Sequence, residues 1–270
     1  MNLPGEVAKN YIEAGKKKAA MGAGKTFLLA AMAGMFIALA GSGASTASCT
    51  IGGSAGKLVG ACIFPAGLTL VLLAGSELFT GNCLLVIPVL EKELSVRAMM
   101  RNWGIVYLGN LAGSVFIAWM VVRSHQLCLF EGALAAASVQ AAQAKVSMPF
   151  WDAFLKGVLC NMLVCLAVWV SFAARDVAGK VTALFYPIVV FVVCGFEHSI
   201  ANMFYCPVGI FAMADPVTSA MLADGAGNGL TWGSFFFKNL VPVTLGNIVG
   251  GSLLVGAAYW LAYLRLDRQG

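Results

Sequence analysis

The chain has 270 residues, of which 60% are hydrophobic and only 11% are charged, and its mean hydropathy is +0.86. A soluble domain carries about 25% charged residues, because those side chains cover its water-facing surface. This composition predicts an integral membrane protein and excludes a soluble enzyme, a nucleic-acid-binding protein and a disordered chain. The 31 glycines agree with that class, since small residues let membrane helices pack closely and break.

The net charge of +5 and the eight cysteines fit the same class. Basic residues stand mostly at the ends of apolar runs, and the cluster Lys16–Lys18 is typical of a topology and lipid-headgroup signal. The cysteines lie mostly within apolar runs and lack CxxC spacing, so we interpret them as buried hydrophobic residues. We therefore expect no metal site, no cofactor and no nucleic-acid partner.

The segment 1–25 is polar and lysine-bearing, and it lacks the apolar core of a signal peptide. Within it Val7, Tyr11 and Ile12, with Ala14 or Ala19, can form one apolar stripe beside lysines. That pattern predicts an amphipathic helix at the inner membrane surface. We hypothesise that it covers the inner pore mouth and responds to pH, although a simple surface anchor fits the pattern equally well.

Six apolar runs are long enough to cross a membrane as helices, which takes about 20 residues each. An even number of crossings places both termini on one side. With that side in the cytoplasm, 12 lysines and arginines fall inside and five outside, so the positive-inside rule predicts cytoplasmic termini. The predicted organisation is a cytoplasmic segment 1–25, a channel domain 26–264 and a cytoplasmic tail 265–270. The runs are 26–48, 58–90, 103–122, 153–174, 181–213 and 239–264.

Two of the runs, 58–90 and 181–213, are too long for a straight crossing. A helix of 33 residues extends about 50 Å, whereas the hydrocarbon core is about 30 Å thick. Both runs contain prolines and glycines. Steep tilt is one explanation. The other is a helix broken near the midplane, which in transporters marks a binding site.

The two long runs also share an internal repeat, GxExxxxN, at positions 75–82 and 195–202. A second pair follows, in which Arg101-Asn102 with Gly109-Asn110 matches Lys238-Asn239 with Gly246-Asn247. Two matches in the same order along the chain predict two halves of three helices each. Because each half crosses an odd number of times, the second copy is inverted. The predicted fold is an all-α, inverted 3+3 repeat with broken second and fifth helices.

Polar residues at the predicted breaks are the candidate site. Freed backbone groups in a membrane need partners or a water-filled cavity, and four side chains are placed to support them or to contact a permeant. His198 lies at the centre of the second long run, where its neutral ring can donate or accept and its protonated ring supplies charge. Thr80 lies at the matching depth in the first long run. The four support candidates are Glu77, Asn82, Glu197 and Asn202.

Two further features suit an anion pathway. Lys145 precedes the fourth span on the predicted outer side, where it would concentrate small anions, unless it is an ordinary snorkelling lysine. Apolar side chains near the breaks serve either as packing or as constrictions that exclude hydrated ions. These side chains are Phe64, Leu68, Leu78, Phe79 and Phe191.

At GSELFTGN (75–82), GFEHSIANMF (195–204) and NLVPVTLGNIVGG (239–251) the chain resembles the formate/nitrite transporter family. The resemblance extends from about residue 25 to 264. It implies a homopentamer of aquaporin-like subunits, each with its own pore, surrounded by lipid in the plasma (inner) membrane of a prokaryote.

The resemblance also implies roles for individual residues. His198 corresponds to the family's central histidine, Thr80 to its loop threonine and Lys145 to its outer lysine. Asn161 and Asn247 correspond to its pore asparagines. The narrow apolar rings correspond to Phe64, Leu68 and Phe191, with Leu78 and Phe79 at the loop side.

The implied function is a channel, not an enzyme, for small monovalent anions of weak acids. Formate is the favoured permeant, with nitrite or hydrosulfide as the alternative. A water or glycerol channel would carry Asn-Pro-Ala at both breaks, whereas this chain has no Asn-Pro dipeptide. A redox enzyme would need haem or metal ligands, and the only histidines are His125 and His198.

Overall fold

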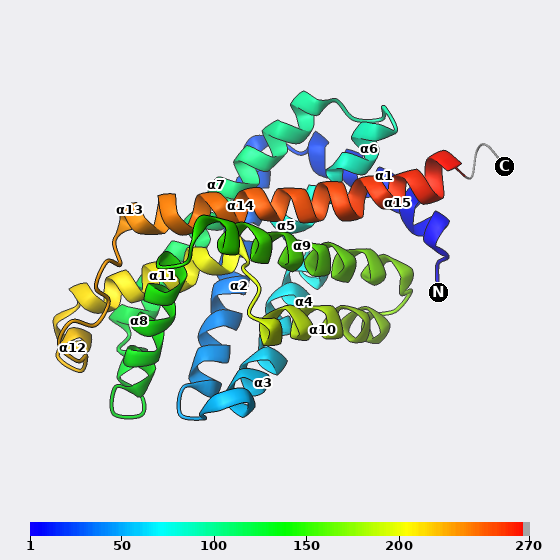
Figure 1. The fold of residues 1–270 in the computed structure, drawn as a ribbon. Coiled ribbons are helices and arrows are strands. Elements are labelled where there is room, and N and C mark those ends of the chain that lie inside the picture. Colours follow the sequence, from blue (N-terminus) through cyan, green and yellow to red (C-terminus); the bar gives the residue numbers. More distant parts are fainter. Residues whose placement is uncertain (267–270) are drawn as a thin grey trace.

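The computed structural model describes residues 1–266 as helices joined mostly by short loops (Figure 1). Within that part of the chain no β-strand occurs. Six of the described helical stretches are long and apolar enough to cross a membrane, which confirms the predicted all-α, six-span fold. The predicted tail at 265–270 falls largely outside the described residues. The six stretches are Ala23–Ser48, Gly53–Leu73, Val96–Arg123, Phe150–Ala173, Val177–Cys194 and Trp232–Arg265.

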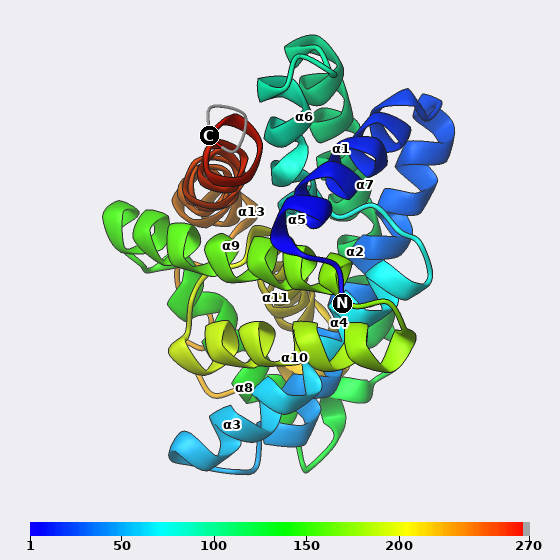
Figure 2. The same cartoon turned by 90° about the vertical axis from the view of Figure 1, so that its right-hand side faces the viewer.

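The first and last helices lie at the same end of the molecule (Figure 1). We call it the inner end, following the predicted topology, and the opposite end the outer end. The first helix, α1 (Pro4–Ala20), packs against α6 (Val86–Leu90) and α9 (Phe150–Ala173), and it crosses the inner end (Figure 2). Most of its apolar stripe is buried against these elements. α1 is therefore part of the folded body of the protein.

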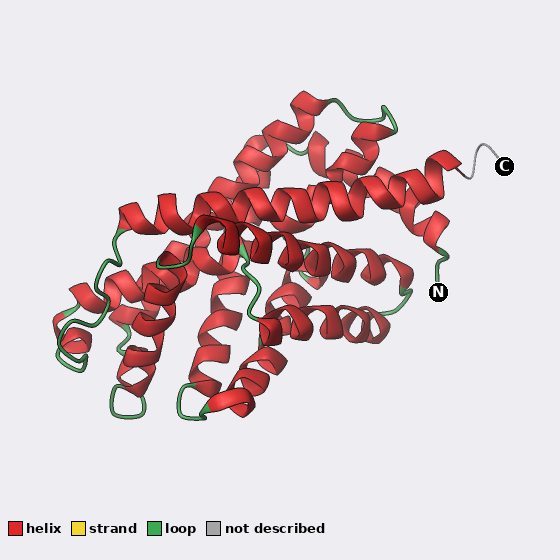
Figure 3. Cartoon of the chain, viewed as in Figure 1, coloured by secondary structure: helices red, strands yellow, loops and turns green. Residues whose placement is uncertain are grey.

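The first long run is interrupted, so its length is explained by a break and not by a steep tilt. Helix stops around Gly75, whose φ of +78° is a left-handed conformation that glycine adopts without steric cost. The chain resumes as a helix at Phe79. Helices joined by loops make up the whole described chain (Figure 3). The elements of this half after α1 are α2 (Ala23–Ser48), α3 (Gly53–Ile63), α4 (Pro65–Leu73), α5 (Phe79–Asn82), η1 (Cys83–Leu85), α6 and α7 (Val96–Arg123).

The second long run is broken in the same way, at Gly195 with a φ of +68°. The final span begins at Trp232, before the predicted start at Asn239, and contains stretches of π-helix. The elements of this half are η2 (Gln126–Cys128), α8 (Ala133–Val146), α9, α10 (Val177–Cys194), α11 (Ser199–Ala214), α12 (Pro216–Ser219), α13 (Trp232–Ser234), η3 (Phe235–Leu240), α14 (Val241–Ile248), η4 (Val249–Ala257), α15 (Ala258–Trp260) and η5 (Leu261–Arg265).

Glycines bring the first and third spans of each half into backbone contact. α2 packs along α7, and α9 packs along α14 and η4. A Cβ on Gly113 would overlap the carbonyl of Ala31, and a Cβ on Gly250 would overlap the carbonyl of Val158. Small residues at such contacts let membrane helices approach closely. The two halves therefore repeat the same close packing, as the inverted repeat predicts.

Candidate functional site

The two breaks meet at the centre of the protein through one side-chain contact. Thr80 lies in α5, just after the first break, and His198 precedes α11, just after the second. Thr80 Oγ1 lies 2.9 Å from His198 Nε2, and both residues are buried. The predicted pair is therefore assembled from residues 118 positions apart.

The other nitrogen of His198 determines which way that hydrogen bond runs. His198 Nδ1 accepts the backbone N–H of Ala201 at 3.1 Å and thereby caps the N-terminus of α11. A nitrogen that accepts carries no proton, so in the neutral ring the proton is on Nε2. Nε2 then donates to the Thr80 hydroxyl oxygen, which leaves the hydroxyl proton of Thr80 free to donate to a third group.

The backbone of Thr80 is held from behind by α9. Its carbonyl accepts Asn161 Nδ2 at 3.3 Å and Cys165 Sγ at 3.2 Å. Asn161 Nδ2 also donates to the carbonyl of Asn247 at 2.7 Å. Asn161, which the family resemblance assigned to the pore, thus bonds backbone carbonyls of the two halves.

Asn247 is bonded to the second break. Its Oδ1 accepts the N–H of Ser199 at 2.9 Å. Its Nδ2 donates to the carbonyls of Glu197 at 3.0 Å and Gly157 at 2.8 Å. Backbone groups beside a helix break lack helical partners, and in a membrane they must be satisfied by protein. The side chain of Asn247 supplies that support.

Asn110 does the same at the first break. Its Oδ1 accepts the N–H of Phe79 at 2.9 Å, and its Nδ2 donates to the carbonyls of Glu77 at 2.9 Å and Ala30 at 2.7 Å. Asn110 is the residue that the second sequence repeat pairs with Asn247. The two Gly-Asn pairs therefore serve as equivalent clamps on the two breaks.

A buried cluster closes the outer side of the second break. Lys145 Nζ lies 2.9 and 3.0 Å from the two carboxylate oxygens of Glu197. Glu197 also accepts Asn202 Nδ2 at 2.7 Å, and the same nitrogen donates to Asn239 Oδ1 at 2.8 Å. Asn239 donates in turn to the carbonyl of Lys145 at 3.1 Å. The lysine is thus held close to the site through both its charge and its backbone.

An equivalent cluster closes the inner side of the first break. Lys18 Nζ lies 2.7 Å from Glu77 Oε1 and 3.1 Å from Asn82 Oδ1. Asn82 Nδ2 donates to Glu77 at 2.7 Å and to Asn102 at 2.9 Å, and Asn102 donates to the carbonyl of Lys18 at 3.4 Å. Apart from the bond of Lys18 to Asn82 Oδ1, the contacts of the outer cluster recur here, and the inverted repeat therefore includes α1, which corresponds to α8.

Lys18 was not among the predicted site residues and was assigned only to the topology cluster. A signal was present in the sequence, since Lys18 and Lys145 each stand shortly before the first spanning helix of their half, which begins at Ala23 and at Phe150. The spacing between paired motifs is not constant along the chain, because the loops between the helices differ in length between the halves. That variation hid the correspondence of the two lysines.

Apolar side chains flank the polar pair. The ring centroids of Phe64 and Phe191 lie 5.6 Å apart in an edge-to-face contact, and the Phe191 ring lies 6.0 Å from that of His198. Leu68 is buried one helical turn beyond Phe64. Phe79 packs instead on Trp103 and Tyr107 of α7. The apolar side chains beside His198 therefore come from the α3–α4 junction and from α10.

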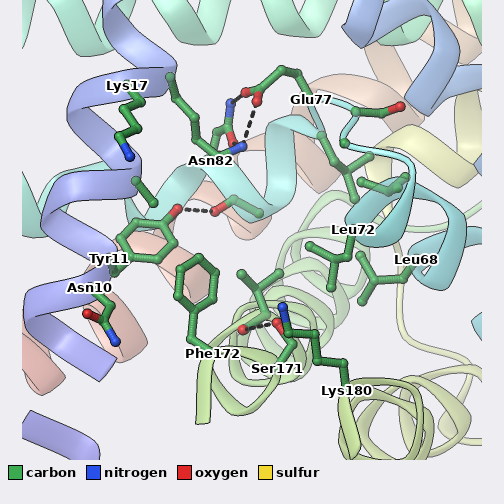
Figure 4. Close-up of a pocket in the computed structure, with 18 of the residues that line it drawn as sticks. Asn10, Tyr11, Lys17, Leu68, Leu72, Glu77, Asn82, Ser171, Phe172 and Lys180 are labelled. Carbon is green, nitrogen blue, oxygen red and sulfur yellow. Dashed lines mark hydrogen bonds and ion pairs between the residues drawn. The ribbon is translucent and has the colours of Figure 1, made fainter. Parts of the chain in front are cut away.

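A cavity of about 550 Å³ opens at the inner end (Figure 4). Its apolar lining includes Leu68, Leu78 and Phe172, and Tyr11 of α1 lies along one side. Its cationic lining is Lys17, Lys18 and Lys180. A concave site bordered by lysines raises the local concentration of small anions.

Comparisons with known proteins agree with this architecture. The model of the formate/nitrite transporter family matches residues 5–261. The chain belongs to that family. It is 40% identical to a "Probable formate transporter" of Methanothermobacter thermautotrophicus, with 97% of each chain covered. It is 39% identical to "Formate channel FocA" of Escherichia coli (strain K12), covering 97% of this chain and 95% of that protein.

A solved structure described as a "Pentameric formate channel with formate bound" matches with a TM-score of 0.79 and 39% identity. The match covers 90% of this chain and 98% of that chain. This formate/nitrite transporter is therefore a multi-pass membrane protein whose second and fifth helices are broken. Its polar residues at the breaks form one hydrogen-bonded pair and two lysine-centred clusters.

Proposed function

We propose that this protein is a homopentameric channel for small monovalent anions of weak acids, with formate as its main permeant. The buried hydrogen bond between Thr80 and His198, beside an apolar constriction, carries the proposal. It is supported by lysines on either side of that constriction, Lys145 and Lys18, and by relatives that are named as formate channels or transporters.

An apolar constriction selects against charge. A bare anion there is very costly, whereas a neutral weak acid passes without needing a polar partner. At the inner cavity Lys17 and Lys180 raise the local concentration of the anion, whereas Lys18 and Lys145 are neutralised by Glu77 and Glu197. Beyond them the low dielectric favours the neutral form of an acid. An anion that takes up a proton from solution on entering can therefore cross, whereas the anion of a strong acid cannot.

His198 serves in this proposal as a hydrogen-bond donor. Its Nδ1 is bonded to the N–H of Ala201, so a second proton on the ring would break the cap of α11. In the neutral ring Nε2–H donates to Thr80, which polarises the threonine hydroxyl toward the permeant. If His198 itself supplied the proton, the hydrogen bond between its Nδ1 and the N–H of Ala201 would have to break.

Uptake into proteoliposomes tests the proposal. Labelled formate should enter above the empty-liposome rate, and its rate should rise as the external pH falls, because the permeating species is the neutral acid. Nitrate is the matched control for nitrite, since it has the same charge and similar size but is the anion of a strong acid. Absence of formate flux would refute formate as the permeant, and faster nitrite or hydrosulfide flux would favour the alternative.

The proposed assembly and location have their own test. A homopentamer is supported by the solved pentameric formate channel, and a plasma (inner) membrane location in a prokaryote is supported by the bacterial and archaeal relatives. Cytoplasmic termini are supported by the lysine and arginine bias. The mass of the protein in lipid nanodiscs should equal five chains. A monomeric or dimeric mass would overturn the pentamer.

A further inference from the structure

One hydrogen bond joins the N-terminal helix to the segment that carries Thr80. Tyr11 of α1 is 1% exposed, and its hydroxyl donates to the carbonyl oxygen of Gly81 at 3.1 Å. Its ring packs on Phe172 of α9 at 5.4 Å (Figure 4). Gly81 is the residue directly after Thr80, so Tyr11 bonds the peptide next to the central pair.

The segment around Thr80 follows the first break directly, so the helix before the break does not fix its orientation. α5 is the first turn of the helical stretch Phe79–Leu90, and the N–H groups of a first turn have no partners within the helix. Side chains from other elements also bond its carbonyls: Asn161 and Cys165 donate to that of Thr80, and Tyr11 donates to that of Gly81. Any rotation of α5 would carry the Thr80 hydroxyl away from His198.

α1 contacts this segment along one face. Tyr11 and Lys18 are separated by about two turns of helix, so their side chains lie on the same side. Tyr11 bonds Gly81, and Lys18 bonds Glu77 and Asn82. A single helix face thus holds both ends of the stretch 77–82.

The tyrosine contact has no counterpart in the outer half of the described chain. When Lys18 is aligned with Lys145, the position equivalent to Tyr11 is Ser138, whose hydroxyl donates to the carbonyl of Leu134 in its own helix. The position equivalent to Gly81 is Ala201, whose N–H is bonded by His198. His198 is therefore bonded to its own helix cap, whereas on the Thr80 side α1 adds a contact to those that α9 and α7 make.

From these contacts we propose that Tyr11 is a positioning residue for permeation. By holding the carbonyl of Gly81 it keeps the Thr80 hydroxyl within hydrogen-bond distance of His198. This inference rests on the proposed function, in which the Thr80–His198 pair meets the permeant. It differs from a cover over the pore mouth, because Tyr11 acts through Thr80 rather than by blocking the cavity.

The first test is spectroscopic and needs no transport. The chain has two histidines, so His125→Gln leaves His198 as the single ¹⁵N-histidine signal in lipid bilayers. In that background Thr80→Val should shift the Nε2 resonance, because it removes the hydrogen-bond acceptor. Tyr11→Phe should shift it in the same direction. An Nε2 resonance that Tyr11→Phe leaves at the wild-type position overturns the proposal.

The second test is a double-mutant cycle on anion flux in proteoliposomes of verified assembly. Tyr11→Phe keeps the ring but loses one hydrogen bond, so flux should fall about three- to tenfold. In the Thr80→Val background the same substitution should have little further effect. An equal loss in both backgrounds would mean that Tyr11 acts independently of Thr80 and would overturn the proposal.

Tyr259→Phe is the matched control, since it removes a phenol hydroxyl from an aromatic residue that packs on Trp169. It should leave both the flux and the His198 resonance unchanged. A channel that carries no formate, with an Nε2 resonance that responds to Tyr11→Phe, would refute the proposed permeant but retain the role of Tyr11. The two failures are therefore distinguishable.

Discussion

Two asparagines account for backbone groups that the broken helices leave free. Asn110 and Asn247 each accept one N–H and donate to two carbonyls at or beside their own break. Both side chains are fully buried. In a membrane no water replaces such bonds, so these residues are needed for the breaks to exist at all.

We expect Asn247→Ala or Asn110→Ala to destabilise the protein severely. Each substitution removes the side-chain partner of three backbone groups, at about 1–3 kcal/mol per buried group. The melting temperature in nanodiscs should fall, and the assembled fraction should fall with it. Asn228→Ala, at an exposed position, is the control and should melt like the wild type. An unchanged melting temperature for Asn247→Ala would mean that the clamp is dispensable.

The sharpest change at His198 is His198→Asn. Asparagine is a good helix N-cap and can still accept the N–H of Ala201, so α11 should form. Its shorter side chain cannot donate to Thr80. We therefore expect an assembled protein whose formate flux falls about tenfold or more but still rises as the external pH falls, because the proton comes from solution. Wild-type flux in verified pentamers would mean that His198 has no donor role, and loss of the pH dependence would mean that His198 supplies the proton.

The sequence indicated His198 because an ionisable residue lies beside a predicted break, and Thr80 because it lies at the matching depth in the other long run. Tyr11 could not be found that way. An aromatic residue on an amphipathic helix is typical of a membrane-facing stripe, and only the fold shows its hydroxyl on Gly81. The bonding partner of a side chain depends on elements that lie far away in sequence.

Among the helices, α1 and α8 are equivalent elements that each carry one buried lysine. In the inner pair the side chain of Lys18 is 25% exposed and that of Glu77 is 6% exposed. In the outer pair the values are 17% for Lys145 and 6% for Glu197. Removing one partner of such a pair leaves an uncompensated buried charge, which costs more than removing both. The two pairs should therefore respond alike to substitution.

We expect Lys18→Met and Glu77→Gln each to lower stability by about 3 kcal/mol or more, and the double variant to lose less than either. Lys145→Met and Glu197→Gln should repeat the pattern in the outer half. Lys16→Met is the control, because the side chain of Lys16 is 39% exposed and its ion pairs are at the surface. Thermal melting of the single and double variants measures this. Strictly additive losses in either half would contradict coupling within that cluster.

The hypothesis that α1 covers the inner pore mouth and responds to pH stays a prediction. Hydrogen bonds to Glu93 and then Glu13 raise the pKa of Lys16 above its usual value, so this lysine stays charged near neutral pH. A raised pKa gives stability that is present below about pH 10 and lost above it. Lys16 is therefore not the group through which α1 would sense acidification.

For the molecule as a whole, the position of the termini can be checked by labelling. Ala135 lies in the predicted outer loop, but it is fully buried in α8 and therefore unsuitable. Exposed alternatives are Glu131 in the outer loop and Glu13 in α1. In a cysteine-less background a membrane-impermeant thiol reagent added outside cells should modify Glu131→Cys and spare Glu13→Cys. The reverse pattern would contradict cytoplasmic termini.

The membrane class, the number of spans and the inverted repeat all follow from the linear pattern of residues. The length and hydropathy of a run indicate whether that segment prefers lipid. Prolines and glycines at matching places in the two halves indicate breaks. Each of these signals is local, so it can be recognised without knowing which other element the segment packs against. The predicted breaks in 58–90 and in 181–213 are confirmed for that reason. The boundary at Trp232 was missed because Lys238 interrupts the apolar pattern.

Which side chains act together depends on the folded arrangement. The Thr80–His198 bond, the contact of Asn161 with Asn247 and the docking of α1 join residues from different spans. Their geometry depends on how glycine-mediated packing rotates and places whole helices. A polar side chain in a membrane bonds whichever polar group the fold places beside it. The linear pattern of residue types does not specify the distance between two such groups.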